Sequence, residues 1–168
     1  AHRLYGDLLF ESGRIDSAFS EYRRADGLSE TPGQHRLFGI ERAIETKKFP
    51  TARTEAMAFL KAYPKHAELF RVNLALARAE LALGNPGPAV GMLKSLASQF
   101  TVETERFRVL YEIAEIYRRA TPEKDSARAY FMTITASPTR APERTASWLR
   151  LGELAIYEGN LPEAESAF

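Results

Sequence analysis

Alanine recurs along this chain at a nearly constant interval, and that period restricts the possible folds more than any other feature. The alanines that share one register are Ala18, Ala52, Ala89, Ala127 and Ala164. The gaps between them are 34, 37, 38 and 37 residues. A period of this length is typical of repeat proteins, in which each supersecondary unit stacks on the next. We therefore expect about five similar units that share a continuous core.

Other residues keep the same register. Glycine stands twelve positions before the first and the last of these alanines, at Gly6 and Gly152. Glycine also stands five positions before three of them, at Gly13, Gly84 and Gly159. An aromatic residue follows four positions after three of them, at Tyr22, Phe131 and Phe168. Small residues allow helices to approach closely and large rings fill the space beside them, so this pattern predicts packed helix pairs.

The residue mix favours helices throughout. Valine and isoleucine together number 11, whereas alanine alone numbers 25. Strands favour β-branched residues, and helices favour alanine, leucine, glutamate and arginine. Apolar residues recur at helical spacing, as in Leu110, Ile113, Ala114 and Tyr117. Glycine and proline interrupt these segments at short intervals. The sequence therefore predicts an all-α fold of about ten helices joined by short turns.

The pattern resembles the tetratricopeptide repeat (TPR), whose unit is two antiparallel helices. The family's Trp, Leu-Gly, turn Gly, Ala and Phe are matched in the last copy by Trp148, Leu151, Gly152, Gly159, Ala164 and Phe168. The resemblance implies a single α–α superhelix over residues 1–168, with repeats at approximately 1–31, 32–66, 67–102, 103–140 and 141–168. Trp148 is expected to fill the core beside the small residues, as are Tyr22 and Phe131. The last repeat is cut short, so we expect the chain to be an excerpt of a longer protein.

A second, shorter resemblance concerns the junction at residues 59–68. The segment Phe59-Leu60-Lys61-Ala62-Tyr63-Pro64-Lys65-His66-Ala67-Glu68 is similar to a junction of bacterial envelope TPR proteins. These are the lipoproteins associated with Tol–Pal and with outer-membrane assembly. The resemblance favours the bacterial periplasm or cell envelope over the cytoplasm.

The sequence contains none of the common catalytic motifs. It has no Gly-rich phosphate loop, no His-Glu-x-x-His pair, no Gly-x-Ser-x-Gly elbow, no acidic calcium loop and no cysteine. His2, His35 and His66 lie about one repeat apart, which is too far for one metal ion. We therefore expect no catalytic residue, no metal site, no cofactor and no enzymatic activity.

In the TPR family, the first helices of successive repeats line a concave groove. Carried over by position, the partner-binding residues are Arg71, Leu74, Arg78, Arg108, Tyr111 and Arg118. The same rule places Phe10 and Leu37 in the groove. Such a surface suits an acidic and hydrophobic peptide, because arginine binds carboxylates and apolar contacts add affinity. In the alternative interpretation, these arginines pair with Glu41, Glu80 or Glu115 and only solubilise the surface.

The leading hypothesis is a non-enzymatic scaffold that binds a partner protein or peptide in this groove. A formal net charge of +1 is unlike a dedicated nucleic-acid surface, and no apolar run is long enough to span a membrane. We therefore expect no nucleic acid and no membrane span. Two alternatives stay open: an RNA-binding module that reads one base per repeat, and self-assembly into homo-oligomers through exposed solenoid ends.

Overall fold

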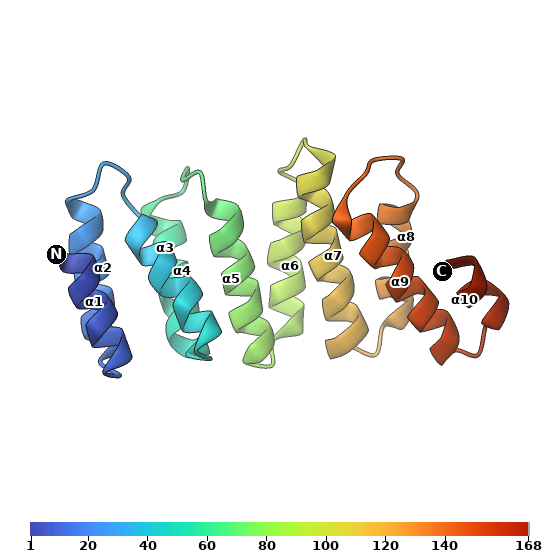
Figure 1. The fold of residues 1–168 in the computed structure, drawn as a ribbon, viewed down its shortest axis with the longest axis horizontal. Coiled ribbons are helices and arrows are strands. Elements are labelled where there is room, and N and C mark those ends of the chain that lie inside the picture. Colours follow the sequence, from blue (N-terminus) through green and yellow to red (C-terminus); the bar gives the residue numbers. More distant parts are fainter. Residues whose placement is uncertain (168) are drawn as a thin grey trace. The chain divides into compact units, whose positions relative to one another are not determined.

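A computed structural model describes residues 1–167, and every regular element in that range is a helix (Figure 1). The all-α expectation is confirmed. In chain order, the described helices are α1 (His2–Glu11), α2 (Ile15–Gly27), α3 (Gln34–Glu45), α4 (Phe49–Ala62), α5 (Leu69–Ala82), α6 (Pro86–Ala97), α7 (Glu103–Ala120), α8 (Lys124–Thr135), α9 (Pro142–Tyr157) and α10 (Leu161–Ala167). In the described range, no helix combines the length and the apolar character needed to cross a bilayer.

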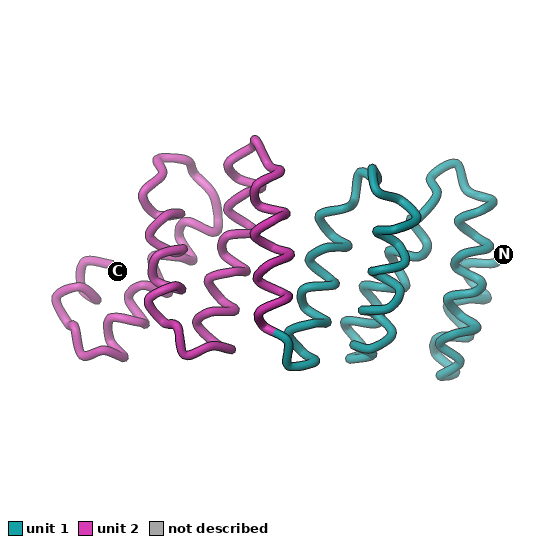
Figure 2. The backbone as a smooth tube through the Cα atoms, turned by 180° about the vertical axis from the view of Figure 1, so that it is seen from behind, with its two compact units in different colours: residues 1–85 teal, residues 86–168 magenta. Residues whose placement is uncertain are grey.

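The chain divides into two compact units (Figure 2). Unit 1 is Ala1–Asn85 and contains α1 to α5, and unit 2 is Pro86–Phe168 and contains α6 to α10. Within each unit every helix packs against the next one along the chain. The boundary between the two units lies at the turn between α5 and α6. The sequence predicts that this turn lies inside the third repeat, residues 67–102. The single array over residues 1–168 therefore stays a prediction.

The small residues of the repeat register are buried, as the pattern predicts. Ala18, Ala52, Ala89 and Ala127 have no exposed surface and Ala164 has almost none. Gly6 and Gly152 are also buried. Phe168, the last aromatic residue of the register, lies outside the described residues. The buried positions therefore follow the repeat in both units.

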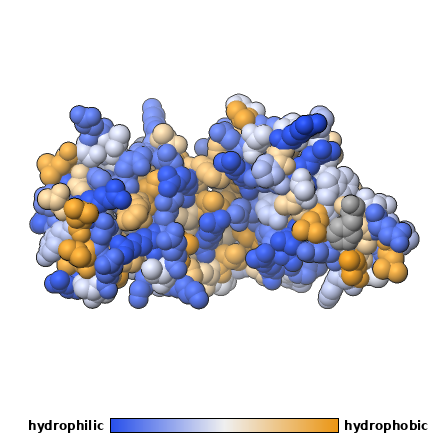
Figure 3. Space-filling view, in the orientation of Figure 1, coloured by the Kyte–Doolittle hydropathy of each residue, from blue (hydrophilic) through white to orange (hydrophobic). Residues whose placement is uncertain are grey.

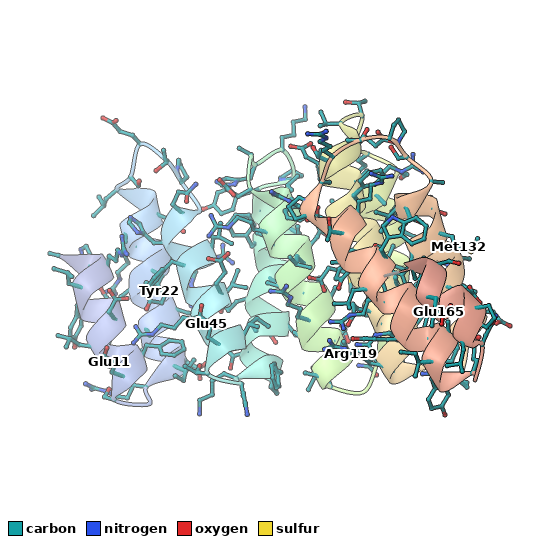
Figure 4. All side chains as sticks on the ribbon, turned by 45° about the vertical axis from the view of Figure 1, so that its right-hand side comes forward. Glu11, Tyr22, Glu45, Arg119, Met132 and Glu165 are labelled. Carbon is teal, nitrogen blue, oxygen red and sulfur yellow. The ribbon has the colours of Figure 1, made fainter. Side chains whose placement is uncertain are left out.

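In unit 1, one buried aromatic ring occupies the space beside two glycines. The fully buried Tyr22 of α2 lies where Gly6 of α1 and Gly39 of α3 have no side chains (Figure 4). A Cβ atom added at Gly6 would lie 2.8 Å from the Tyr22 ring, and one added at Gly39 would lie 2.7 Å from it. The Tyr22 ring also meets Phe19 edge-on, with 5.6 Å between centroids. Tyr22 therefore joins three consecutive helices in one packing unit.

The hydroxyl group of Tyr22 is satisfied at the edge of this core. It donates a hydrogen bond of 2.8 Å to Asp7 Oδ1, and Arg42 lies 3.5 Å from the same carboxylate oxygen. Burial and then the Asp7 carboxylate raise the pKa of Tyr22 to about 12. The phenol therefore stays a neutral donor at physiological pH.

The start of α3 is held by a carboxylate from the preceding helix. Asp26 of α2 is almost fully buried, and its oxygens accept hydrogen bonds from the backbone N–H groups of His35 (2.9 Å) and Arg36 (3.3 Å). These N–H groups belong to the first turn of α3, where helical partners are lacking. Gly33, the N-cap residue of α3, has no side chain with which to cap the helix. Asp26 therefore supplies this cap across the junction between two helix pairs.

The core of unit 2 is built around Phe131 of α8, as its place in the register predicts. Phe131 has no exposed surface and packs with Ala114 of α7, Ala127 of α8 and Leu151 of α9. The Tyr111 ring covers this cluster from α7, with 5.6 Å between the two ring centroids. The cluster joins three consecutive helices, as Tyr22 does in unit 1.

The expectation that Trp148 fills the core is wrong. Its surface is 39% exposed, and it borders an open hollow of about 280 Å³ together with Met132 and Ala136. The buried stripe of α9 consists of Ser147, Leu151, Leu154 and Ala155. Trp148 lies at the edge of that stripe, because the helix turns about 100° per residue and places its ring beside the core.

The turns inside four helix pairs each contain one residue with a positive φ at the same register position. Gly13, Gly84 and Gly159 have φ values of 80°, 85° and 75°. The equivalent residue of the second pair, five positions before Ala52, is Lys47, with φ 60°. The equivalent residue of the fourth pair is Pro122, whose ring fixes φ near −65°. The backbone of the fourth turn therefore follows a different path.

Apolar residues on α1 form an exposed patch on the surface of unit 1 (Figure 3). Leu4, Tyr5 and Leu8 lie on adjacent positions of the helix surface, and each is more than half exposed. Self-association through the ends of the chain stays a prediction.

Replacing Gly39 by alanine tests the contact with Tyr22. Gly39→Ala is expected to lower the free energy of unfolding by about 1–3 kcal/mol, because the new methyl group overlaps the Tyr22 and Phe19 rings. Gly27→Ala is the control, since no atom lies within 4 Å of a Cβ added there. The control should be neutral or slightly stabilising. Urea unfolding followed by circular dichroism measures both variants, and equal stability would contradict the proposed packing.

Replacing Lys47 by glycine tests the shared turn. Lys47→Gly is expected to raise the free energy of unfolding by about 1 kcal/mol, because an L side chain is strained at positive φ. Gly13→Ala should lower it by a similar amount through backbone strain alone, since a Cβ there meets no atom within 4 Å. Thermal and urea unfolding of both variants would show opposite shifts. Shifts of the same sign would argue against a common turn.

Candidate functional site

The first helices of the predicted repeats form one surface in each unit. In unit 1 α3 contacts α5 directly, and in unit 2 α7 contacts α9. We call these two surfaces the unit 1 face and the unit 2 face. Of the six predicted groove residues, Arg71, Leu74 and Arg78 lie on α5, and Arg108, Tyr111 and Arg118 lie on α7.

The unit 1 face contains a small hollow between α3 and α5. Its volume is about 150 Å³, and it is lined by Glu41, Ile44, Glu45, Arg71, Leu74, Ala75 and Arg78. Ile44, Leu74 and Ala75 supply apolar surface, whereas the other lining residues are charged. The structure therefore brings the three predicted residues of α5 to one hollow.

Arg71 is already paired within this hollow. Its Nε and Nη2 atoms donate to the two carboxylate oxygens of Glu41 over 2.8 and 2.6 Å, and Glu68 lies 3.4 Å from Nη1. The hydrogen bond from Arg71 to Glu41 contributes most to raising the pKa of the Arg71 guanidinium. For Arg71, the structure agrees with the alternative in which Glu41 neutralises the arginine.

The unit 2 face is organised by one carboxylate and three guanidinium groups. Glu115 of α7 accepts hydrogen bonds of 2.9 Å from both Nε and Nη2 of Arg118. Arg119 Nη2 lies 2.7 Å from the same carboxylate, and Arg150 Nε of α9 lies 3.1 Å from it. Glu153 receives Arg150 Nη1 on both of its oxygens at 2.8 Å. We call Glu115, Arg118, Arg119, Arg150 and Glu153 the arginine cluster.

Contacts within the arginine cluster shift the pKa values of Glu115 and Arg150. Burial alone would raise the pKa of Glu115, but the hydrogen bonds from Arg118 and the charges of Arg118, Arg119 and Arg150 outweigh burial and lower that pKa. The hydrogen bond to Glu153 contributes most to raising the pKa of Arg150. Glu115 is therefore ionised and Arg150 is therefore protonated at neutral pH.

The other predicted residues of α7 differ in environment. Arg108 is exposed and lies 3.7 Å from Glu143. Tyr111 is partly buried against Phe131. Phe10 and Leu37, which the sequence rule also placed in the groove, are buried in the core. The prediction that these two residues line the groove is wrong. Positions spaced i and i+3 occur both on the side of a first helix that faces the core and on the side that faces the groove.

Sequence reasoning missed Arg119 and Arg150. Arg119 follows Glu115 by four residues, which is a spacing for a helical ion pair and could have identified it. Arg150 contacts Glu115 across 35 residues of sequence. No short-range spacing in the sequence predicts this ion pair, because it forms only when α9 packs on α7.

The histidines have separate surroundings, and no group of three metal-ligating side chains occurs in residues 1–167. The His2 ring is bonded to Glu21 over 2.6 Å, and His66 Nε2 lies 3.0 Å from the Pro32 carbonyl oxygen. His66 Nδ1 accepts the backbone N–H of Glu68, so one ring nitrogen binds within the junction at residues 59–68 and the other contacts the link between α2 and α3. The His66 ring also packs edge-on against Phe59.

The whole chain resembles a solved helical-repeat structure. It aligns with the crystal structure of MamA, a TPR-like protein, with a TM-score of 0.68 and 17% sequence identity. The alignment covers 97% of this chain and 90% of that chain. This chain has a TPR-like fold. The likeness concerns the fold alone. No family model matches the sequence, and no curated protein matches it.

The lowered pKa of Glu115 predicts how stability depends on pH. A depressed folded-state pKa stabilises the protein above the unfolded-state pKa of about 4.5, and that stabilisation is lost as the pH falls through the folded-state value. Glu115→Gln should lower the free energy of unfolding by about 1–3 kcal/mol at pH 7. The difference from the wild type should shrink as the pH falls from 5 to 3.

Urea unfolding at several pH values measures this effect. Glu30→Gln is the control, because Glu30 is exposed in the link between α2 and α3. A constant difference between wild type and Glu115→Gln across the pH range would show that the ionised carboxylate does not stabilise the fold.

Proposed function

We propose that this chain is a non-enzymatic scaffold that binds a segment of a partner protein on its first-helix faces. The hollow between α3 and α5 is the observation that carries the proposal. Leu74 is only partly buried there and lies among charged side chains. Apolar surface with a charged rim is the usual composition of a peptide-binding surface, since the apolar part supplies affinity and the rim supplies orientation.

Further support comes from the TPR-like fold, in which repeated helix pairs display long surfaces. The segment at residues 59–68 supports a setting in the bacterial periplasm or cell envelope, because of its resemblance to the junction of envelope TPR proteins. Within the fold, Phe59, Tyr63 and His66 of this segment pack their rings together.

Site-specific photo-crosslinking tests the scaffold function, because it captures whichever protein contacts a chosen surface position. Benzoylphenylalanine is placed at Leu74 or Leu149, which lie on the unit 1 face and the unit 2 face. Control positions are Leu28 and Met57, which are exposed apolar residues at the end of α2 and on α4, the second helices of their pairs. In cells that contain the full-length protein, the face positions should form adducts with a discrete partner at several times the control yield.

Equal yields at all four positions would contradict the proposal. Each variant is first compared with the wild type by circular dichroism, so that a loss of adducts reflects the surface and not unfolding.

A further inference from the structure

The arginine cluster of the unit 2 face has more hydrogen-bond donors than its own carboxylates can accept. Three guanidinium groups carry about fifteen N–H donors, and two carboxylates offer about eight lone-pair sites. The formal charge of the cluster is +3 from Arg118, Arg119 and Arg150 and −2 from Glu115 and Glu153, which leaves +1. The cluster can therefore accept a further anion without removing either glutamate.

Arg119 has most of the N–H donors that the two glutamates do not bind. Its side chain is 63% exposed, whereas those of Arg118 and Arg150 are about one quarter exposed. Among the described residues, Arg119 pairs with Glu115, and this ion pair engages its Nη2 atom. Arg119 belongs to the last turn of α7 and extends from the surface of unit 2 (Figure 4).

The cluster borders an exposed apolar strip on α9. Leu149 and Ile156 are 47% and 53% exposed and are seven residues apart, so they lie on the same side of the helix. Glu153 lies between them along the helix and binds Arg150. Cationic and apolar surfaces are therefore neighbours on one face of unit 2.

We propose that the unit 2 face binds an acidic segment of a partner protein in which carboxylates alternate with apolar residues. Arg119 and Arg150 bind the carboxylates of the partner, and Leu149 and Ile156 contact its apolar side chains. This inference rests on the proposed scaffold function and names the chemistry of the partner.

Two physical reasons favour this partner. A guanidinium group binds a carboxylate through paired, charge-assisted hydrogen bonds, which are stronger than neutral ones. Glu115 and Glu153 already hold Arg118 and Arg150 in place. Less side-chain freedom is then lost when a partner binds.

Fluorescence anisotropy with a defined probe tests the proposal. The probe is a labelled peptide of about twelve residues with four glutamates and three leucines on a Gly-Ser background. One comparison peptide has glutamine for each glutamate, and another has serine for each leucine. The wild-type chain should bind the probe at least tenfold more tightly than either comparison peptide.

Matched variants locate the site on the protein. Arg119→Glu should weaken probe binding about tenfold, whereas Arg106→Glu, the same exchange at an exposed residue of α7, should change it less than twofold. Leu149→Ser should weaken binding several-fold, and Leu28→Ser should not. Circular dichroism confirms that each variant is folded.

The outcomes separate the two proposals. Equal binding of the glutamate and glutamine peptides, or equal effects of Arg119→Glu and Arg106→Glu, overturns the acidic partner. If crosslinks at Leu149 persist in that case, the scaffold function stands. If a single-stranded RNA of twelve nucleotides binds more tightly than the probe and loses affinity in Arg119→Glu, the cluster serves nucleic acid and the acidic protein partner is wrong.

Discussion

Packing of large rings against residues with a very small side chain or none holds the helices of each unit together. Tyr22 shows it most clearly, because Gly6 and Gly39 each leave less than 3 Å between a would-be Cβ atom and its ring. One ring therefore holds α1, α2 and α3 together. Phe131 joins α7, α8 and α9 in the same way, with Ala114 and Ala127 as the small partners. Because a helix pair cannot bury its apolar side alone, each unit depends on contacts of this kind between neighbours.

Ion pairs form a second layer that orders the surface of each unit. Arg71 and Glu41 join α5 to α3, and Arg150 and Glu115 join α9 to α7, so both faces carry a link between first helices. Each of these two arginines therefore already has a carboxylate partner within the fold. The two faces still differ, since Arg71 meets Glu41 and Glu68, whereas Glu115 is shared by three arginines. This difference is why the excess of donors lies on the unit 2 face.

Much of the fold and part of the site could be predicted from the sequence. The alanine register identified buried positions, and the glycines before Ala18, Ala89 and Ala164 identified turns of positive φ. Lys47 escaped that rule, because its conformation is imposed by the turn and not by its residue type. Trp148 was misplaced because a rotation of one residue moves a side chain to the edge of the buried stripe. The contact of Arg150 with Glu115 has no local signal at all.

The helical class, the period and the small residues that allow close packing follow from the amino-acid sequence alone. These properties are local or periodic, and each depends on residue type and spacing alone. In contrast, the packing of the helices sets which arginines share a carboxylate, which apolar residues stay exposed and how Asp26 caps the next helix. Those contacts join residues of different helices, and their geometry depends on how each helix is rotated and packed against its neighbour.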